Sequence, residues 1–231
     1  MDTMPMPCGS MSMAWMPMCG QSWIGAAASF LTLWIVMTAA MMLPSLAPRL
    51  WRYRRDAAGA GQLASVLLTV VVAGGYFLVW TLIGAAVYLL GAATMAMTMR
   101  YPALARAVPT AIGVVVLAAG ALQFTRWKAH QLARCRNDGC RASAACSPYP
   151  SVTPLAAWGH GLRLGLHCSL SSAGLTAAFL VAGIMDWPVM LAVTAAINVE
   201  RLAPGGERYA RLIGAVVIGA GSLAIVRAAG I

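Results

Sequence analysis

The stretch LASVLLTVVVAGGYFLVWTLIGAAVYLLG at 63–91 decides the fold class, because no charged residue occurs between Asp56 and Arg100. A helix that crosses the hydrocarbon core of a bilayer needs about 20 mainly apolar residues, and it bonds every backbone polar group within itself. This stretch is long enough for one tilted helix or for two short helices that meet at Gly74 and Gly75. On either interpretation it is expected to lie in a membrane.

The rest of the chain has a similar composition. Hydrophobic residues make up 61% of the 231 residues and charged residues only 10%, against about 45–50% and about 25% in soluble domains. With 63–91 taken as one helix, the other expected spans are 23–43, 104–124, 162–184, 187–199 and 212–228. No Lys or Arg precedes Arg49, so 23–43 lacks the basic start of a secretory signal and is expected to be retained. The prediction is an all-α, multi-pass bundle of six transmembrane helices.

The basic residues give the expected orientation. The net charge is +10, but in membrane proteins Lys and Arg collect in cytoplasmic loops, so the charge requires no nucleic acid partner. If 63–91 is a single helix, the basic clusters at 49–55, 126–141 and 201–211 share one side of the membrane; two helices would separate the first two clusters. The single helix is therefore favoured. It gives a membrane domain at 23–231 with a cytoplasmic loop at 126–161 and both termini outside.

Residues 1–22 are expected to form an external arm. Residues 1–20 read MDTMPMPCGSMSMAWMPMCG, with seven Met and two Cys, and the interleaved Pro and Gly disfavour a regular helix. Thioether and thiolate groups are soft donors that select Cu(I), which makes copper the expected metal. The candidate ligands are Met4, Met6, Cys8, Met16, Met18 and Cys19. The alternatives are that the methionines are adaptable apolar filler that packs on the bundle or a partner, and that Cys8 and Cys19 form a disulfide.

A second candidate site lies in the cytoplasmic half of the predicted bundle. Met41 and Met42 (in MTAAMMLPS), His167 and Cys168 (in GLHCSLSSAGL) and Glu200 (in NVERLAPGGER) are expected at similar depth. Coordinating groups at such depth usually face the bundle interior, where this set would suit copper or, less well, zinc. The alternative is that Glu200 pairs with a nearby arginine, Arg163 or Arg201, and that His167 donates to a backbone carbonyl.

His167 and Cys168 are not expected to serve one centre equally, because adjacent helical residues differ in direction by about 100°. At most one of them is expected to face the interior. His167 is favoured, because its exposure to lipid would be the more costly.

Small residues recur on two predicted spans, with Gly113 and Gly120 on one and Gly214, Gly219 and Gly221 on the other. Small side chains let helix backbones approach closely in membranes. These faces are expected to pack within the bundle rather than to form a dimer interface.

The segments WIVMTAAMMLPSLAPRLWRYRR, GYFLVWTLIGAAVY, GLRLGLHC and ERLAPGGER resemble a bacterial family of unknown function that is described as predicted metal-binding integral membrane proteins. The resemblance runs from about Trp23 to the C-terminus, and AMMLPS is its most specific element. It implies a multi-pass protein of the bacterial inner membrane. The family pattern follows the Cys of the fourth span with a Cys-Cys pair, which here corresponds to Ser171 and Ser172, so only Cys168 remains of that set.

These observations favour a membrane protein that binds or handles a soft metal, with Cu(I) bound through the external arm. The alternative is an accessory or structural subunit of a larger membrane complex, such as a copper-containing membrane enzyme, with the arm packed on another subunit. An enzyme is less favoured, because no nucleophile, base and orienting group occur at a useful spacing.

Overall fold

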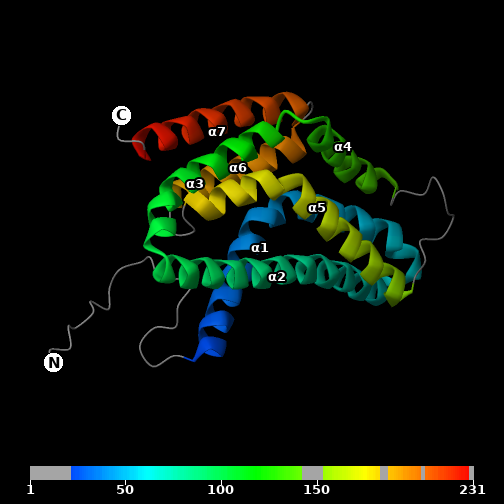
Figure 1. The fold of residues 1–231 in the computed structure, drawn as a ribbon. Coiled ribbons are helices and arrows are strands. Elements are labelled where there is room, and N and C mark those ends of the chain that lie inside the picture. Colours follow the sequence, from blue (N-terminus) through cyan, green and yellow to red (C-terminus); the bar gives the residue numbers. More distant parts are fainter. Residues whose placement is uncertain (1–21, 142–152, 183–186, 204–205, 229–231) are drawn as a thin grey trace.

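The computed structural model describes residues 22–141, 153–182, 187–203 and 206–228, and this part of the chain contains helices and no strands (Figure 1). The all-α prediction is therefore confirmed for the described residues. The helices are α1 (Trp23–Asp56), α2 (Gln62–Arg100), α3 (Pro102–Leu122), α4 (Arg126–Arg141), α5 (Pro154–Ala182), α6 (Trp187–Leu202) and α7 (Gly206–Ala228), with a 3-10 turn at Ala57–Ala60. The predicted arm ligands lie outside the described residues.

Four of the described helices, α1, α2, α5 and α7, are long and apolar enough to cross a membrane. A fifth span results if α3 and α4 cross together, with a bend of 63° between Ala107–Leu122 and Arg126–Ala133. Helix α6 has 16 residues, fewer than the about 20 that a straight span requires. The count of six spans and the outside location of the termini stay predictions.

Helix α2 runs without interruption through Gly74 and Gly75, which agrees with the single helix that the charge pattern favoured. Helix α1 is longer than the expected span and continues past Pro44 and Pro48 to Asp56. Its first turn is capped by Ser22, whose hydroxyl accepts a hydrogen bond from the Gly25 N–H at 3.1 Å.

The segment 126–161, predicted as a loop, contains α4 and the first turns of α5. Three residues of α4, namely Lys128, Gln131 and Leu132, are buried at the i, i+3 and i+4 spacing of one helix face. That face packs on α5. The basic residues of this segment favour a cytoplasmic loop in the sequence, and the charge of Lys128 on the inward-facing stripe hides the apolar pattern that a buried helix face usually shows.

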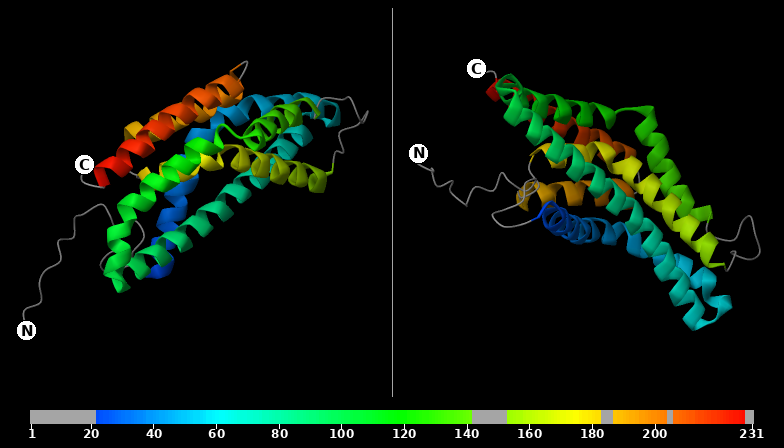
Figure 2. Two further views of the ribbon diagram at one scale, coloured as in Figure 1. Left: turned by 45° about the horizontal axis from the view of Figure 1, so that its top comes forward. Right: turned by 60° about the horizontal axis from the view of Figure 1, so that its bottom comes forward.

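Two helix pairs pack most extensively, α2 with α5 and α3 with α7, and α3 and α7 run side by side in both views of Figure 2. Between α2 and α5, a Cβ added at Gly161 would lie 2.2 Å from the Val72 carbonyl oxygen. Between α3 and α7, a Cβ at Gly120 or Gly214 would lie 3.1 Å from the carbonyl oxygen of the other. The close packing predicted for the glycines of these two helices is confirmed at Gly120 and Gly214, whereas a Cβ at Gly219 would meet nothing within 4 Å.

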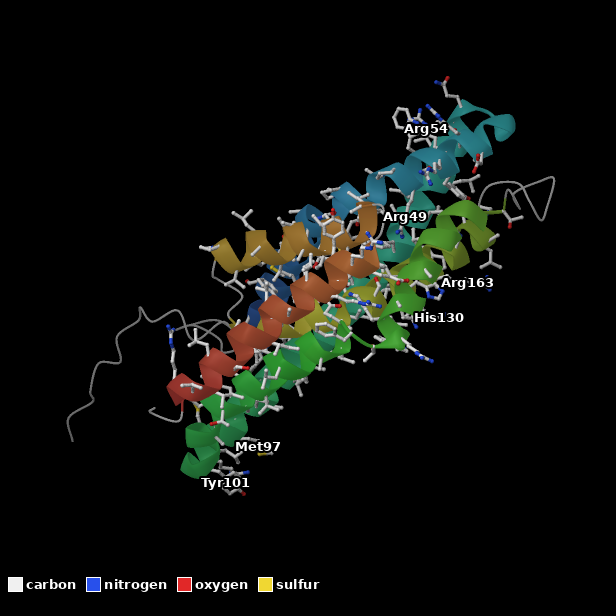
Figure 3. The ribbon with its side chains drawn as sticks, turned by 90° about the horizontal axis from the view of Figure 1, so that it is seen from above. Arg49, Arg54, Met97, Tyr101, His130 and Arg163 are labelled. Carbon is white, nitrogen blue, oxygen red and sulfur yellow. The ribbon has the colours of Figure 1, made fainter. Side chains whose placement is uncertain are left out.

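The two ends of the molecule differ in charge. In Figure 3, Arg49, Arg54 and Arg163 lie toward one end of the bundle, and Met97 and Tyr101 lie at the opposite end. The methionine-bearing end also carries Arg100, the last residue of α2, so the separation of charge is partial and the orientation stays a prediction.

Candidate functional site

Buried polar and sulfur-bearing side chains gather where α1, α2, α5 and α6 meet, around the guanidinium group of Arg201. Its Nη1 donates to Cys168 Sγ at 2.7 Å, to Ser45 Oγ at 3.3 Å and to Met42 Sδ at 3.5 Å. Its Nη2 donates to the Cys168 carbonyl at 2.8 Å and to Ser171 Oγ at 3.1 Å. We call this group of residues, with Tyr76 and Ser172, the Cys168 cluster.

The thiol of Cys168 is the centre of this cluster. The residue is 1% exposed, and its sulfur shares a hydrogen bond of 2.8 Å with the Tyr76 hydroxyl in addition to the contact with Arg201. Cys168 belongs to the main hydrophobic core, together with Met42, Tyr76 and Leu164. A guanidinium and a phenol therefore cover the sulfur in a site that solvent does not reach.

Ser171 and Ser172 follow Cys168 by three and four positions, so all three share one face of α5. Both serines are buried, and their hydroxyls donate to the Cys168 carbonyl at 2.8 and 3.0 Å. The positions at which the resembled family carries a Cys-Cys pair thus turn toward the core beside Cys168.

A buried ion pair adjoins the Cys168 cluster on the side of α3 and α4. Lys128 Nζ lies 2.8 Å from Glu200 Oε2, and Gln123 Nε2 donates to Glu200 Oε1 at 2.7 Å. Lys128 Nζ also donates to the carbonyl of Ser171. Because Ser171 bonds to Arg201 as well, the Lys128–Glu200 pair and the Cys168 cluster form one continuous polar network.

The structure brings together two of the predicted inner ligands, Met42 and Cys168. Both sulfurs bond to the same nitrogen of Arg201, at 3.5 and 2.7 Å, so their separation cannot exceed the sum of these distances. Met41 is also buried, and its carbonyl accepts a hydrogen bond from Asn198 Nδ2 at 3.1 Å.

Glu200 is held by Lys128 and Gln123. His167 is only partly buried, so the expectation that His167 rather than Cys168 faces the interior is wrong. The packing of α5 on α2 decides this, because it directs the face with Leu164, Cys168 and Ser171 inward. Among the described residues, no group of three or more His, Cys, Asp or Glu side chains is placed to hold a metal ion.

Lys128, Gln123 and Tyr76 are members of this network that the sequence does not single out, and Arg201, which is expected at the membrane surface, lies in its centre. One signal for a buried partner was present, since Glu200 is an acidic residue at the end of an apolar run, where an ionisable side chain needs a counter-charge. The sequence did not identify that counter-charge as Lys128, which lies on a different helix.

The family described as PpoB2, copper chaperone, matches residues 31–224 of the chain. No curated protein and no solved structure matches it. The matched region includes the Cys168 cluster and the Lys128–Glu200 pair and begins after the Met/Cys arm. Because the match extends over most of the chain, the protein belongs to the PpoB2 copper chaperone family.

Proposed function

We propose that this protein is a multi-pass membrane copper chaperone that takes up Cu(I) on its Met/Cys arm outside the membrane and delivers it to a copper-dependent protein. Membership of the copper chaperone family supports the metal. The four helices of spanning length support the location. The seven methionines and two cysteines among residues 1–20 supply soft donors.

The position of Arg201 is the main reason for assigning copper uptake to the arm. Its Nη1 lies between Cys168 Sγ and Met42 Sδ, at 2.7 and 3.5 Å. An arginine side chain stays positively charged in proteins, so in this conformation it excludes a copper ion from these two sulfurs by charge and by volume. The arm provides more soft donors, and its thioethers keep their donor ability in an oxidising compartment.

Met42 and Cys168 form a second, inner site in this proposal, which opens when Arg201 moves away. Met41, His167 and Glu200 contribute to this site only if α1, α5 and α6 rearrange. The Glu200 carboxylate is paired with Lys128, and the Met41 carbonyl accepts a hydrogen bond from Asn198. Met4, Met6, Cys8, Met16, Met18 and Cys19 are the proposed ligands of the arm.

The test is copper analysis of the full chain purified in mild detergent under reducing conditions. A variant with Met4, Met6, Met16 and Met18 changed to Leu keeps side-chain size and removes four thioethers, so its bound copper should fall to less than half that of the parent. The matched control changes Met97 and Met99, both exposed on α2, to Leu and should retain its copper. An unchanged copper content in the arm variant would refute the assignment, and metal-free co-purification with other membrane subunits would favour an accessory subunit instead.

A further inference from the structure

A small cleft opens where the end of α3 turns into α4 and both face the first turns of α7. It has a volume of about 70 Å³, and its lining includes Phe124, Arg126, Lys128, Glu207 and Arg211. Its most buried lining residues are Leu132 and Ala210, each 2% exposed, with Gln123 and Lys128 at 4%. The cleft therefore has a buried floor of apolar and polar side chains beneath the exposed side chains of Arg126 and Arg211.

The rim carries excess positive charge. Arg126, Lys128 and Arg211 line the cleft against the single carboxylate of Glu207, and Lys128 is already engaged with Glu200. Arg126 and Arg211 are exposed, and guanidinium groups bind the oxygens of phosphate in a bidentate geometry. Helices α4 and α7 begin at Arg126 and Gly206, so both direct their positive dipole ends toward this region.

Apolar and aromatic side chains surround this basic rim. Phe124 is 49% exposed and Trp127 is 43% exposed. Leu122 and Leu212, at the adjoining ends of α3 and α7, are exposed as well. Aromatic side chains beside basic ones are typical of the boundary between lipid and water, and basic pockets between helices on the cytoplasmic side bind anionic headgroups.

We propose that this cleft binds the phosphate of an anionic phospholipid, with Arg126 and Arg211 holding the phosphate oxygens and the acyl chains lying along α3 and α7. Free phosphate offers the same charge but leaves the apolar border without a partner, which favours the lipid. The inference uses the membrane location of the proposed function but is independent of copper.

The test measures thermal stability and lipid retention of the full chain in neutral detergent as phosphatidylglycerol, phosphatidylcholine or inorganic phosphate is added. Phosphatidylglycerol should raise the melting temperature more than either of the others. Changing Arg126 and Arg211 together to Gln should weaken the apparent affinity for phosphatidylglycerol at least tenfold. The matched control changes Arg52 and Arg54, which are exposed on α1, to Gln and removes the same charge, so it should behave like the parent.

An equal response to phosphatidylglycerol in both double variants would overturn the proposal, as would an equal response of the parent to inorganic phosphate or to phosphatidylcholine. A variant with Arg126 and Arg211 changed to Lys keeps the charge and should recover part of the affinity. This comparison separates loss of the site from misfolding. Copper content should be the same in all of these variants, so failure here is distinguishable from failure of the copper proposal.

Discussion

Lys128 and Glu200 form an ion pair inside the bundle, with 2.8 Å between Nζ and Oε2 and side chains that are 5% and 3% exposed. The pair joins α4 to α6, and the bond from Lys128 to the Ser171 carbonyl joins both to α5. Lys128, a deeply buried charge, thereby fixes the strongly polar helix α4 against the bundle.

Replacing one member of this pair should lower the free energy of unfolding more than replacing both. Lys128→Met or Glu200→Gln leaves an uncompensated charge in the interior, which costs about 3–5 kcal/mol. The double variant leaves no buried charge from the pair and should recover most of that loss. Unfolding of the three variants in the same detergent measures the coupling. If the stability loss of the double variant equals the sum of the losses in the two single variants, the pair does not act as a unit.

The close approach of α2 and α5 should make Gly161 intolerant of a methyl group. In Gly161→Ala the new Cβ would lie 2.2 Å from the Val72 carbonyl oxygen, and the backbone shift that relieves this overlap costs about 1–3 kcal/mol. Gly219→Ala is the control, because nothing lies within 4 Å of its Cβ, and it should be neutral or slightly stabilising. Thermal unfolding compares the two, and equal stabilities would contradict the observed packing.

Restoring thiols beside Cys168 should create copper binding in the core. In Ser171→Cys/Ser172→Cys the new sulfurs share a face with Cys168, and thiolates are strong ligands for Cu(I). In a background lacking the four arm methionines, this variant should retain copper that its parent does not hold. The control is Ser169→Cys, because the Ser169 hydroxyl donates to the Leu166 carbonyl at an exposed position. Equal copper contents in the two variants would argue against the geometry of the Cys168 cluster.

The orientation can be tested with the native cysteines in intact cells. An impermeant thiol reagent should label Cys8 or Cys19 under reducing conditions, because the arm is predicted to lie outside. It should not label Cys135, Cys140 or Cys146, and Cys168 should also stay unmodified because it is 1% exposed. Labelling between 135 and 146 would invert the predicted orientation.

Local sequence properties determined the helical class, the uninterrupted course of α2 and the small-residue contacts. The helical class and the small-residue contacts depend on residues within one segment, since hydropathy and glycine spacing are read along it, whereas the single helix α2 followed from the basic clusters on either side of it. The expectation of a soft metal came from the Met/Cys arm and from the family resemblance; the copper chaperone family supports copper, and the arm as its binding site stays a proposal. Hydropathy does not determine the count of spans, because α6 is short, α3 and α4 meet at a bend, and the pattern does not show how such segments lie.

Only the tertiary structure decided which polar groups are buried together. Lys128 and Arg201 read as surface charges in the sequence, because basic residues near helix ends usually stay in water. In the folded chain Lys128 meets Glu200, and Arg201 meets Cys168, Met42 and Ser171. A buried charge is tolerated only where partners from other helices satisfy it, and those partners come together only when the helices pack. For the same reason Cys168 rather than His167 lies in the core, since the neighbouring helices determine which face of α5 turns inward.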